Sequence, residues 1–230
     1  MSPVNDPALA TAREAVVAAC RRAAAERLVV GTAGNISVLV GELVAITATG
    51  AVFGELDLDE VVVVDRDGQV VEGDLEPTSE LDLHLGLYSD TDAQAVVHTH
   101  APVSTAMSTV LTELPCIHYQ QLLLGGAVRV APYATFGTAE LAAHVRAALD
   151  GRSAALMASH GSVAVGGTVE KALDNALLLE WLCTLYRDAS VVGTPAVLDE
   201  AQQEAVVLAA IERKYGTTRP VDRPTPQENP

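Results

Sequence analysis

Paired runs of β-branched residues, joined by short turns, limit this chain to folds that contain antiparallel hairpins. The runs are Ile36–Val40 with Leu43–Thr47, and Val61–Val64 with Val70–Val71. Gly41-Glu42 joins the first pair, and Asp65-Arg66-Asp67-Gly68 joins the second. Asp-Gly readily adopts the positive φ angles of a tight turn. Because a hairpin places its two strands side by side, the sheet is predicted to be largely antiparallel or mixed.

Helical patterns alternate with the strand-like segments. Apolar residues recur at helical spacing in four segments, Asp6–Leu28, Thr138–Leu149, Val169–Arg187 and Leu198–Lys214. Further strand-like runs are Ala95–His98, Ala154–Ser159 and Ser162–Val165. Pro77-Thr78-Ser79-Glu80 is predicted to open a helix, with Thr78 or Ser79 able to cap it. This order favours one domain in which helices pack on the faces of a sheet.

The charge balance narrows the range of partners. The 230 residues include 14 Lys+Arg and 30 Asp+Glu, a formal net charge of −16. An acidic chain without a basic stripe is not expected to bind nucleic acid or an anionic membrane surface. No apolar run approaches the roughly 20 residues of a membrane span, and no signal peptide is evident. Cys20, Cys116 and Cys183 are scattered and odd in number, as is typical of buried thiols, so we expect a cytoplasmic globular protein.

Three histidines stand at places suited to binding a metal ion. His98 and His100 form His-Thr-His at the end of a predicted strand, and His160 precedes Gly161 at another strand end. Alternate residues of a strand point to the same face, so His98 and His100 can reach one ion. Three histidines with one variable position are a common arrangement for catalytic Zn²⁺. The alternative interpretation is a pair of ordinary polar residues at a strand end.

Three turns offer donors that suit a phosphate group. They are Gly31-Thr32-Ala33-Gly34-Asn35, Thr47-Ala48-Thr49-Gly50 and Thr78-Ser79. Such turns expose backbone N–H groups and hydroxyls to an anion. Since the overall field of an acidic chain repels anions, neutral donors would have to hold the phosphate locally. Each turn, taken singly, is also compatible with a plain connection.

Eight motifs in order resemble the class II sugar-phosphate aldolase and epimerase family. They are GTAGNIS, ITATG, PTSE, HTH, IHY, APYATFGT, SHG and KYG, and the similarity runs in register from about Asp6 to Tyr215. The resemblance implies a single three-layer α/β/α domain with a mostly antiparallel central sheet. This domain is expected over residues 1–216, followed by a proline-rich tail over residues 217–230.

The resemblance also implies the metal ligands. The family holds zinc with the two histidines of its HxH segment, a histidine before a glycine and, in the aldolases, a glutamate that follows hydroxyl residues. These positions correspond here to Glu80, His98, His100 and His160. One Zn²⁺ per subunit is therefore expected, with Mn²⁺ or Co²⁺ as alternatives.

The other site residues follow from the same resemblance. The positions implied for phosphate binding are Thr32, Gly34, Asn35, Thr49, Gly50, Thr78 and Ser79. Tyr119 corresponds to a tyrosine that donates a proton from a neighbouring subunit, and Tyr215 to one that closes over the site. The family is tetrameric, so a homotetramer with active sites at subunit interfaces is expected.

The residues themselves agree with metal-assisted carbon–carbon cleavage. The only lysines, Lys171 and Lys214, lie in helical patterns and are not placed for a Schiff base, so a metal is the remaining electron sink. Glu rather than Asp at position 80 favours an aldolase over the similar epimerases. The expected reaction converts a ketose 1-phosphate such as L-fuculose 1-phosphate into dihydroxyacetone phosphate and L-lactaldehyde. Alternatives are a 5-deoxypentulose-1-phosphate aldolase, a pentulose-phosphate 4-epimerase, a dehydratase, a decarboxylase or a non-catalytic adducin-like scaffold.

Four further residues are interpreted more plainly. His84, one helical turn after Glu80, is more typical of a helix surface than of a partner to that glutamate. His118 either orients Tyr119 or plays no part. Tyr133 and Phe136 are predicted to shape the fold or an interface.

Overall fold

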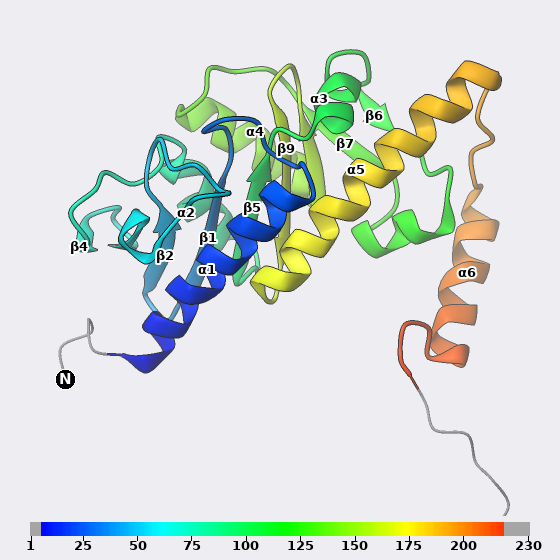
Figure 1. Cartoon of the computed structure of the whole chain (residues 1–230). Coiled ribbons are helices and arrows are strands. Elements are labelled where there is room, and N and C mark those ends of the chain that lie inside the picture. The colour runs from blue at the N-terminus through cyan, green and yellow to red at the C-terminus, as the bar shows by residue number, and fades with distance from the viewer. Residues whose placement is uncertain (1–5, 219–230) are drawn as a thin grey trace, which may run out of the picture. The chain divides into compact units, whose positions relative to one another are not determined.

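A computed structural model describes residues 6–218, which fall into two compact units divided between Val197 and Leu198 (Figure 1). The first unit contains one sheet whose strands follow the order β4-β3-β2-β1-β5-β9-β8-β7-β6. Adjacent strands are antiparallel except β7 and β8, which are parallel. The strands are β1 (Asn35–Val40), β2 (Leu43–Thr47), β3 (Val61–Asp65), β4 (Val70–Glu72), β5 (Ala95–Thr99), β6 (Glu113–Leu114), β7 (Val128–Ala131), β8 (Ala154–Met157) and β9 (Gly161–Gly166). The predicted, mostly antiparallel sheet is confirmed.

Helices cover both faces of this sheet. The helical elements of the first unit are α1 (Pro7–Ala25), η2 (Leu58–Glu60), α2 (Leu81–Asp90), α3 (Pro102–Ser108), η3 (Tyr119–Leu124), α4 (Ala139–Leu149) and α5 (Val169–Val192). Helices α1, α3 and α5 pack on one face, where α1 and α5 run side by side, and α2 and α4 pack on the other (Figure 1). The three-layer α/β/α architecture is therefore confirmed.

Period-two alternation in the strands produces the two hydrophobic cores. In β3, Val61 and Val63 belong to the core beneath α1 and α5, whereas Val62 and Val64 belong to the core beneath α2 and α4. All four valines are fully buried. An unbroken valine run is what a strand covered on both faces requires, because neither set of side chains meets water.

The structure also contains elements that the sequence pattern does not predict. These are α3, β6 and β7, which have 7, 2 and 4 residues. Segments this short carry too few residues to display a periodicity. Helix α5 also continues past the predicted end at Arg187 and stops at Val192, before Gly193.

The second compact unit contains α6 (Glu200–Arg213). Asp199 and Gln202 form a reciprocal capping box at its start. Lys214 ends the helix in the left-handed region, and the Tyr215 N–H donates to the Ala210 carbonyl. The sequence places Tyr215 within one domain ending at residue 216, whereas the structure assigns it to this separate unit. Of the predicted tail over 217–230, residues 219–230 lie outside the described part of the chain.

Among residues 6–218, every helix is either too short or too polar to span a lipid bilayer.

Candidate metal centre and active site

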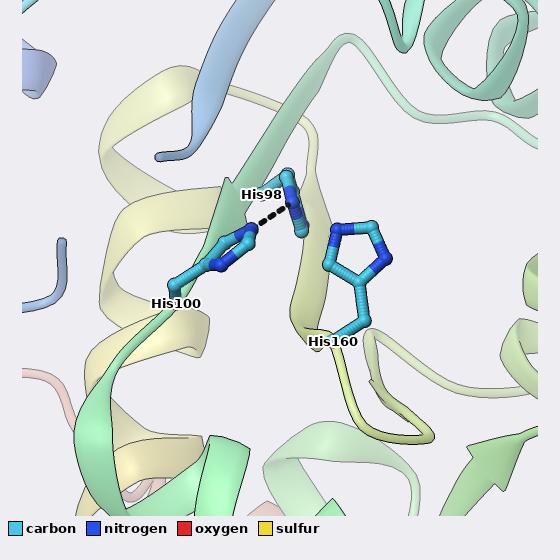
Figure 2. A group of neighbouring side chains, drawn as sticks. All are labelled: His98, His100 and His160. Carbon is cyan, nitrogen blue, oxygen red and sulfur yellow. Dashed lines mark hydrogen bonds between the residues drawn. The ribbon is translucent and has the colours of Figure 1, made fainter. Parts of the chain in front are cut away.

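The three predicted histidines converge at the ends of two central strands, β5 and β9 (Figure 2). His98 lies in β5, His100 directly after it, and His160 in the turn that leads into β9. One ring nitrogen from each histidine lies within 4.8 Å of the others. Strands β5 and β9 are adjacent in the sheet, which brings His160 beside the His-Thr-His segment. This geometry fits a shared metal ion.

Gly161 permits this approach of the two strands. A Cβ at this position would clash with the Thr99 carbonyl oxygen, and it would also lie 3.3 Å from the His100 ring. A residue with a side chain would therefore push β9 away from the histidines of β5. Strand packing alone therefore requires glycine at position 161, whether or not a ligand is bound.

His98 is oriented in the manner of a metal ligand. Its side chain is fully buried, and its Nδ1 lies 2.9 Å from the Ser162 carbonyl oxygen. Since a carbonyl only accepts, Nδ1 carries the proton and Nε2 is the nitrogen that faces the other histidines. Metal-ligating histidines usually donate their second ring nitrogen to such a partner, which fixes the tautomer.

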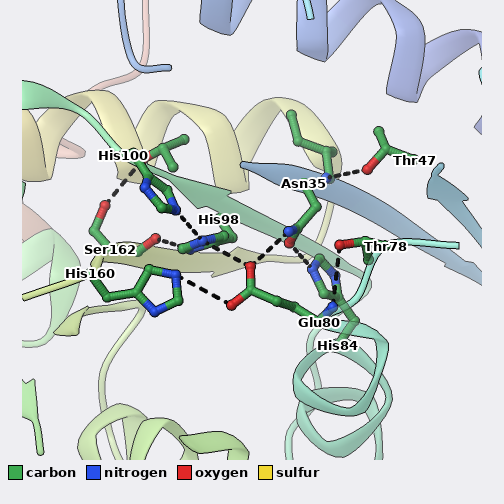
Figure 3. A network of polar contacts seen from close by, with 11 residues as sticks. Asn35, Thr47, Thr78, Glu80, His84, His98, His100, His160 and Ser162 are labelled. Atoms are coloured by element: carbon green, nitrogen blue, oxygen red, sulfur yellow. Dashed lines mark hydrogen bonds and ion pairs between the residues drawn. The ribbon is translucent and has the colours of Figure 1, made fainter. Parts of the chain in front are cut away.

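Glu80 completes the cluster from the other side (Figure 3). It stands at the N-cap of α2, and its Oε2 lies 3.0 Å from His98 Nε2. Its Oε1 lies 3.4 Å from His160 Nε2 and is buried without a hydrogen-bond partner among residues 6–218. Three imidazole nitrogens and one carboxylate are a donor set that suits Zn²⁺. The residues present thus fit the expected metal.

Electrostatics keep the glutamate ionised. Burial acts to raise the pKa of Glu80, but His98, the Asn35 amide and His160 outweigh it and hold the pKa well below its usual range. Burial also favours neutral His98, yet the adjacent Glu80 raises the pKa of that histidine. Burial together with His98 lowers the pKa of His100 to about 4, and the same causes lower the pKa of His160. His100 and His160 are therefore in the neutral form that binds metals.

An open pocket of about 370 Å³ lies over this cluster. Its lining includes Glu80, His100 and His160 together with every residue that the sequence suggested for phosphate binding, namely Thr32, Gly34, Asn35, Thr49, Gly50, Thr78 and Ser79. The three turns, distant in sequence, thus meet at one pocket. Gly34 adopts φ +104°, and a Cβ there would lie 2.9 Å from the His98 carbonyl oxygen, so this turn needs glycine to reach β5.

The contacts of Asn35 and the burial of His84 were not predicted from the sequence. The Asn35 amide nitrogen donates to Glu80 Oε2 at 2.9 Å, and its oxygen lies 2.5 Å from His84 Nε2. One N–H of the carboxamide is therefore engaged with Glu80; Asn35 also lines the pocket, and its role in phosphate binding stays a prediction. The preferred interpretation of His84 as a helix-surface residue is wrong, since it is fully buried. Its helix packs its inner face on β1, which local spacing alone does not reveal.

Of the two predicted catalytic tyrosines, Tyr119 belongs to the same unit as this pocket but is not among its lining residues. Tyr119 begins η3, and the neighbouring His118 ring lies 4.6 Å from its ring and 5.0 Å from that of Trp181. His118 thus contacts Tyr119, in keeping with an orienting role. Tyr215 belongs to the C-terminal unit.

Three lining residues were assigned no chemical role from sequence. Tyr133 and Phe136, interpreted as shaping the fold or an interface, line the pocket with about two-thirds of their surface exposed. Ser159 precedes His160 and adopts a left-handed backbone with φ +53°. Adjacency to His160 is the one sequence signal for Ser159.

Comparisons with known proteins identify the family of this chain. The family model described as "Class II Aldolase and Adducin N-terminal domain" matches residues 14–187. The chain is 37% identical to a 5-deoxy-D-ribulose 1-phosphate aldolase of Bacillus thuringiensis serovar kurstaki, covering 84% of this chain and 92% of that one. It is 41% identical to the L-fuculose phosphate aldolase of Escherichia coli K12, covering 81% and 86%. A solved L-fuculose 1-phosphate aldolase superposes with a TM-score of 0.83 at 34% identity, covering 89% and 97%. The chain therefore belongs to the class II aldolase and adducin N-terminal domain family.

Proposed function

We propose that this protein is a zinc-dependent aldolase that reversibly cleaves a ketose 1-phosphate into dihydroxyacetone phosphate and a small aldehyde. The observation that carries the proposal is the meeting of Glu80, His98, His100 and His160 at a pocket walled by glycine- and hydroxyl-bearing turns. The intact ligand set argues against a non-catalytic adducin-like scaffold. Named aldolases among the relatives support the reaction class.

Three histidines and Glu80 would hold the ion. Neutral nitrogen donors with one carboxylate favour Zn²⁺, and Mn²⁺ or Co²⁺ remain alternatives for the same ligands. A bound divalent cation would supply Lewis-acid stabilisation of the negative charge that develops beside the substrate carbonyl.

The phosphate would be held by neutral groups. Within the described part of the chain, the pocket lining contains no lysine or arginine. Thr32, Thr49, Thr78 and Ser79 bring hydroxyls, and the glycine-bearing turns bring backbone N–H groups. Such donors select an anion by close fit, which suits a protein whose net charge of −16 gives no general attraction.

Two side chains would move protons during cleavage. As the C3–C4 bond breaks, its electron pair stays on C3, and the C4 hydroxyl loses its proton as it becomes the aldehyde carbonyl. Glu80, ionised beforehand, would take up a proton from solvent and pass it to C3. Tyr119 of a neighbouring subunit would accept the hydroxyl proton while releasing its own phenolic proton to solvent, so one proton is lost at C4 and one is gained at C3. Tyr215 would close over the bound substrate. These roles require a homotetramer with sites at subunit interfaces, which is part of the proposal.

The aldehyde half of the substrate is the finer question. The two relatives described above are named for L-fuculose phosphate and for 5-deoxy-D-ribulose 1-phosphate. Both are deoxy ketose phosphates, so both are candidate substrates here. A 4-epimerase, a dehydratase or a decarboxylase would use the same ligands, but Glu80 favours the aldolase.

The test measures dihydroxyacetone phosphate released from each of the two sugar phosphates. We expect release from at least one of them, its loss on treatment with a chelator, and recovery on adding back Zn²⁺. Product analysis that finds epimerisation, dehydration or CO₂ release without cleavage would replace the aldolase by a related enzyme. Turnover that survives complete metal removal would refute the metal-dependent mechanism.

A further inference from the structure

Buried polar side chains continue from Glu80 into the space between β1 and α2 (Figure 3). Asn35 bridges Glu80 and His84, with distances of 2.9 Å and 2.5 Å. Beyond it, Ser37 Oγ lies 2.6 Å from His84 Nδ1 and 2.6 Å from the Tyr88 hydroxyl. Each of the five residues is at most 6% exposed. We call this series, from Tyr88 to Glu80, the buried chain.

The side-chain periodicities of β1 and α2 bring the residues of the buried chain together. Asn35 and Ser37 are alternate residues of β1, so they point to the same face of the sheet. Glu80, His84 and Tyr88 follow each other at intervals of four along α2, so they share one side of that helix. The packing of α2 on β1 therefore interleaves the two sets.

The chemistry of the partners gives the buried chain one direction. The ionised Glu80 only accepts, so the Asn35 amide nitrogen donates to it and the Asn35 oxygen must accept from His84 Nε2–H. Burial lowers the pKa of His84 to about 3, so the ring is neutral and its Nδ1 is a bare acceptor. Ser37 then donates to Nδ1 and accepts from the Tyr88 hydroxyl.

We infer that His84 is a positioning residue for the proposed aldolase reaction: its Nε2–H tautomer orients the Asn35 amide, which anchors Glu80 through Oε2 and leaves Oε1 for the pocket. The opposite tautomer would present a lone pair to the Asn35 oxygen. The amide would then turn its oxygen toward the carboxylate, acceptor against acceptor.

The division between the two carboxylate oxygens has a functional consequence. Oε2 has a hydrogen bond from Asn35, whereas buried Oε1 has none from the described residues and lies 3.4 Å from His160 Nε2. A carboxylate held at one oxygen has a fixed orientation, and its second oxygen stays available to a ligand or a substrate proton.

The tautomer is measured without metal or substrate. In metal-free, ¹⁵N-histidine-labelled protein, we expect the His84 ring to show a protonated Nε2 and an unprotonated Nδ1 from about pH 5 to about pH 8. The signals that disappear in His84→Gln identify that ring. A protonated Nδ1, or a charged ring in this range, would overturn the inference.

Kinetics separate positioning from plain structural support. His84→Leu removes the donor to Asn35, whereas His84→Gln keeps an N–H donor near the Nε2 position. We expect His84→Leu to lower kcat about 10- to 100-fold with KM changed less than about 3-fold, and His84→Gln to stay within about 5-fold of the parent. Leu87→Val, a core change in the same helix, is the matched control and should leave kcat unaltered. Equal losses in the leucine and glutamine variants would contradict the positioning role.

The inference rests on the proposed function but is decided apart from it. Should the parent cleave no sugar phosphate, zinc affinity measured by chelator competition replaces kcat as the readout. His84→Leu is then expected to weaken zinc binding about 10-fold and His84→Gln to retain it. Unchanged affinity in both variants would reject the positioning role, whatever the reaction.

Discussion

Glu80 is a buried carboxylate between two histidines, and its replacement by glutamine tests the candidate site at the scale of one residue. Glutamine keeps the volume but cannot carry the proton or the charge. We expect Glu80→Gln to lower kcat at least about 100-fold and to weaken zinc binding about 10-fold, with an unchanged circular dichroism spectrum. The control is Glu76→Gln, which removes an exposed charge in the same loop. Activity above about a third of the parent value would contradict a catalytic Glu80.

Cysteine reactivity is a second residue-scale prediction. Burial raises the pKa of Cys20, Cys116 and Cys183 above the usual range of a thiol. Each is at most 2% exposed, so thiolate is scarce and inaccessible. In the native protein we expect none of the three to react with Ellman's reagent on the timescale of an exposed thiol, and all three to react in denaturant. Ser89→Cys, at an exposed position of α2, supplies the reactive control.

At this scale the sequence predicted that the three histidines come together, but not how the residues around them are buried and bonded. The spacing of His98 and His100 on a strand requires only local geometry, and Glu80 followed from the family resemblance. His84 was misjudged because its burial depends on which side of α2 meets β1. Asn35 was assigned to phosphate, yet its side chain contacts Glu80.

At the scale of elements, a carboxylate of α5 caps α3 directly after the His-Thr-His segment. Glu180 accepts the N–H groups of Val103 and Ser104 at 2.9 Å and 2.7 Å. Hydrogen bonds to a partly buried charge stabilise more than neutral or exposed ones. Because α3 begins two residues after His100, this contact anchors the chain that leaves the cluster.

Removing this capping charge should therefore lower stability. We expect Glu180→Gln to reduce the free energy of unfolding by about 1–2 kcal/mol in urea titrations at fixed protein concentration. Asp174→Asn, which breaks an exposed ion pair of the same helix with Arg22, should cost less than about 1 kcal/mol. Equal costs would mean that the α3 cap stabilises no more than a surface pair.

At the scale of the whole molecule, the proposed tetramer makes a prediction about mixed subunits. Tyr119 does not line the pocket of its own chain, so its proposed role needs a second subunit. Glu80→Gln and Tyr119→Phe, each inactive alone, should recover about a quarter of the parental activity when refolded together at equal amounts. Random assembly pairs an intact Glu80 with an intact Tyr119 in about one case of four.

The control mixes Glu80→Gln with His98→Gln. Both changes fall in one chain's cluster, so no mixture restores a complete site. Recovery in this control would point to an exchange artefact. A lack of recovery in the Tyr119 mixture, with a tetramer found by light scattering, would remove that tyrosine from the mechanism.

Local structure could be predicted from the sequence pattern: the hairpins, the long helices and the placement of His98 and His100 at a strand end. Each depends on backbone periods and turn chemistry within a few residues, which composition and spacing display directly. The short elements α3 and β6 were not predicted, because seven and two residues repeat a helical or strand period too few times to stand out.

The way these strands and helices pack together depends on contacts between segments that are far apart in the sequence. The order of the sheet set β5 beside both β1 and β9, and this adjacency placed Asn35 opposite His98 and His160 next to it. The packing of α2 on β1 buries His84 and brings together the residues of the buried chain, which ends at Glu80. Burial and hydrogen-bond direction arise from contacts between distant segments, so no local pattern encodes them.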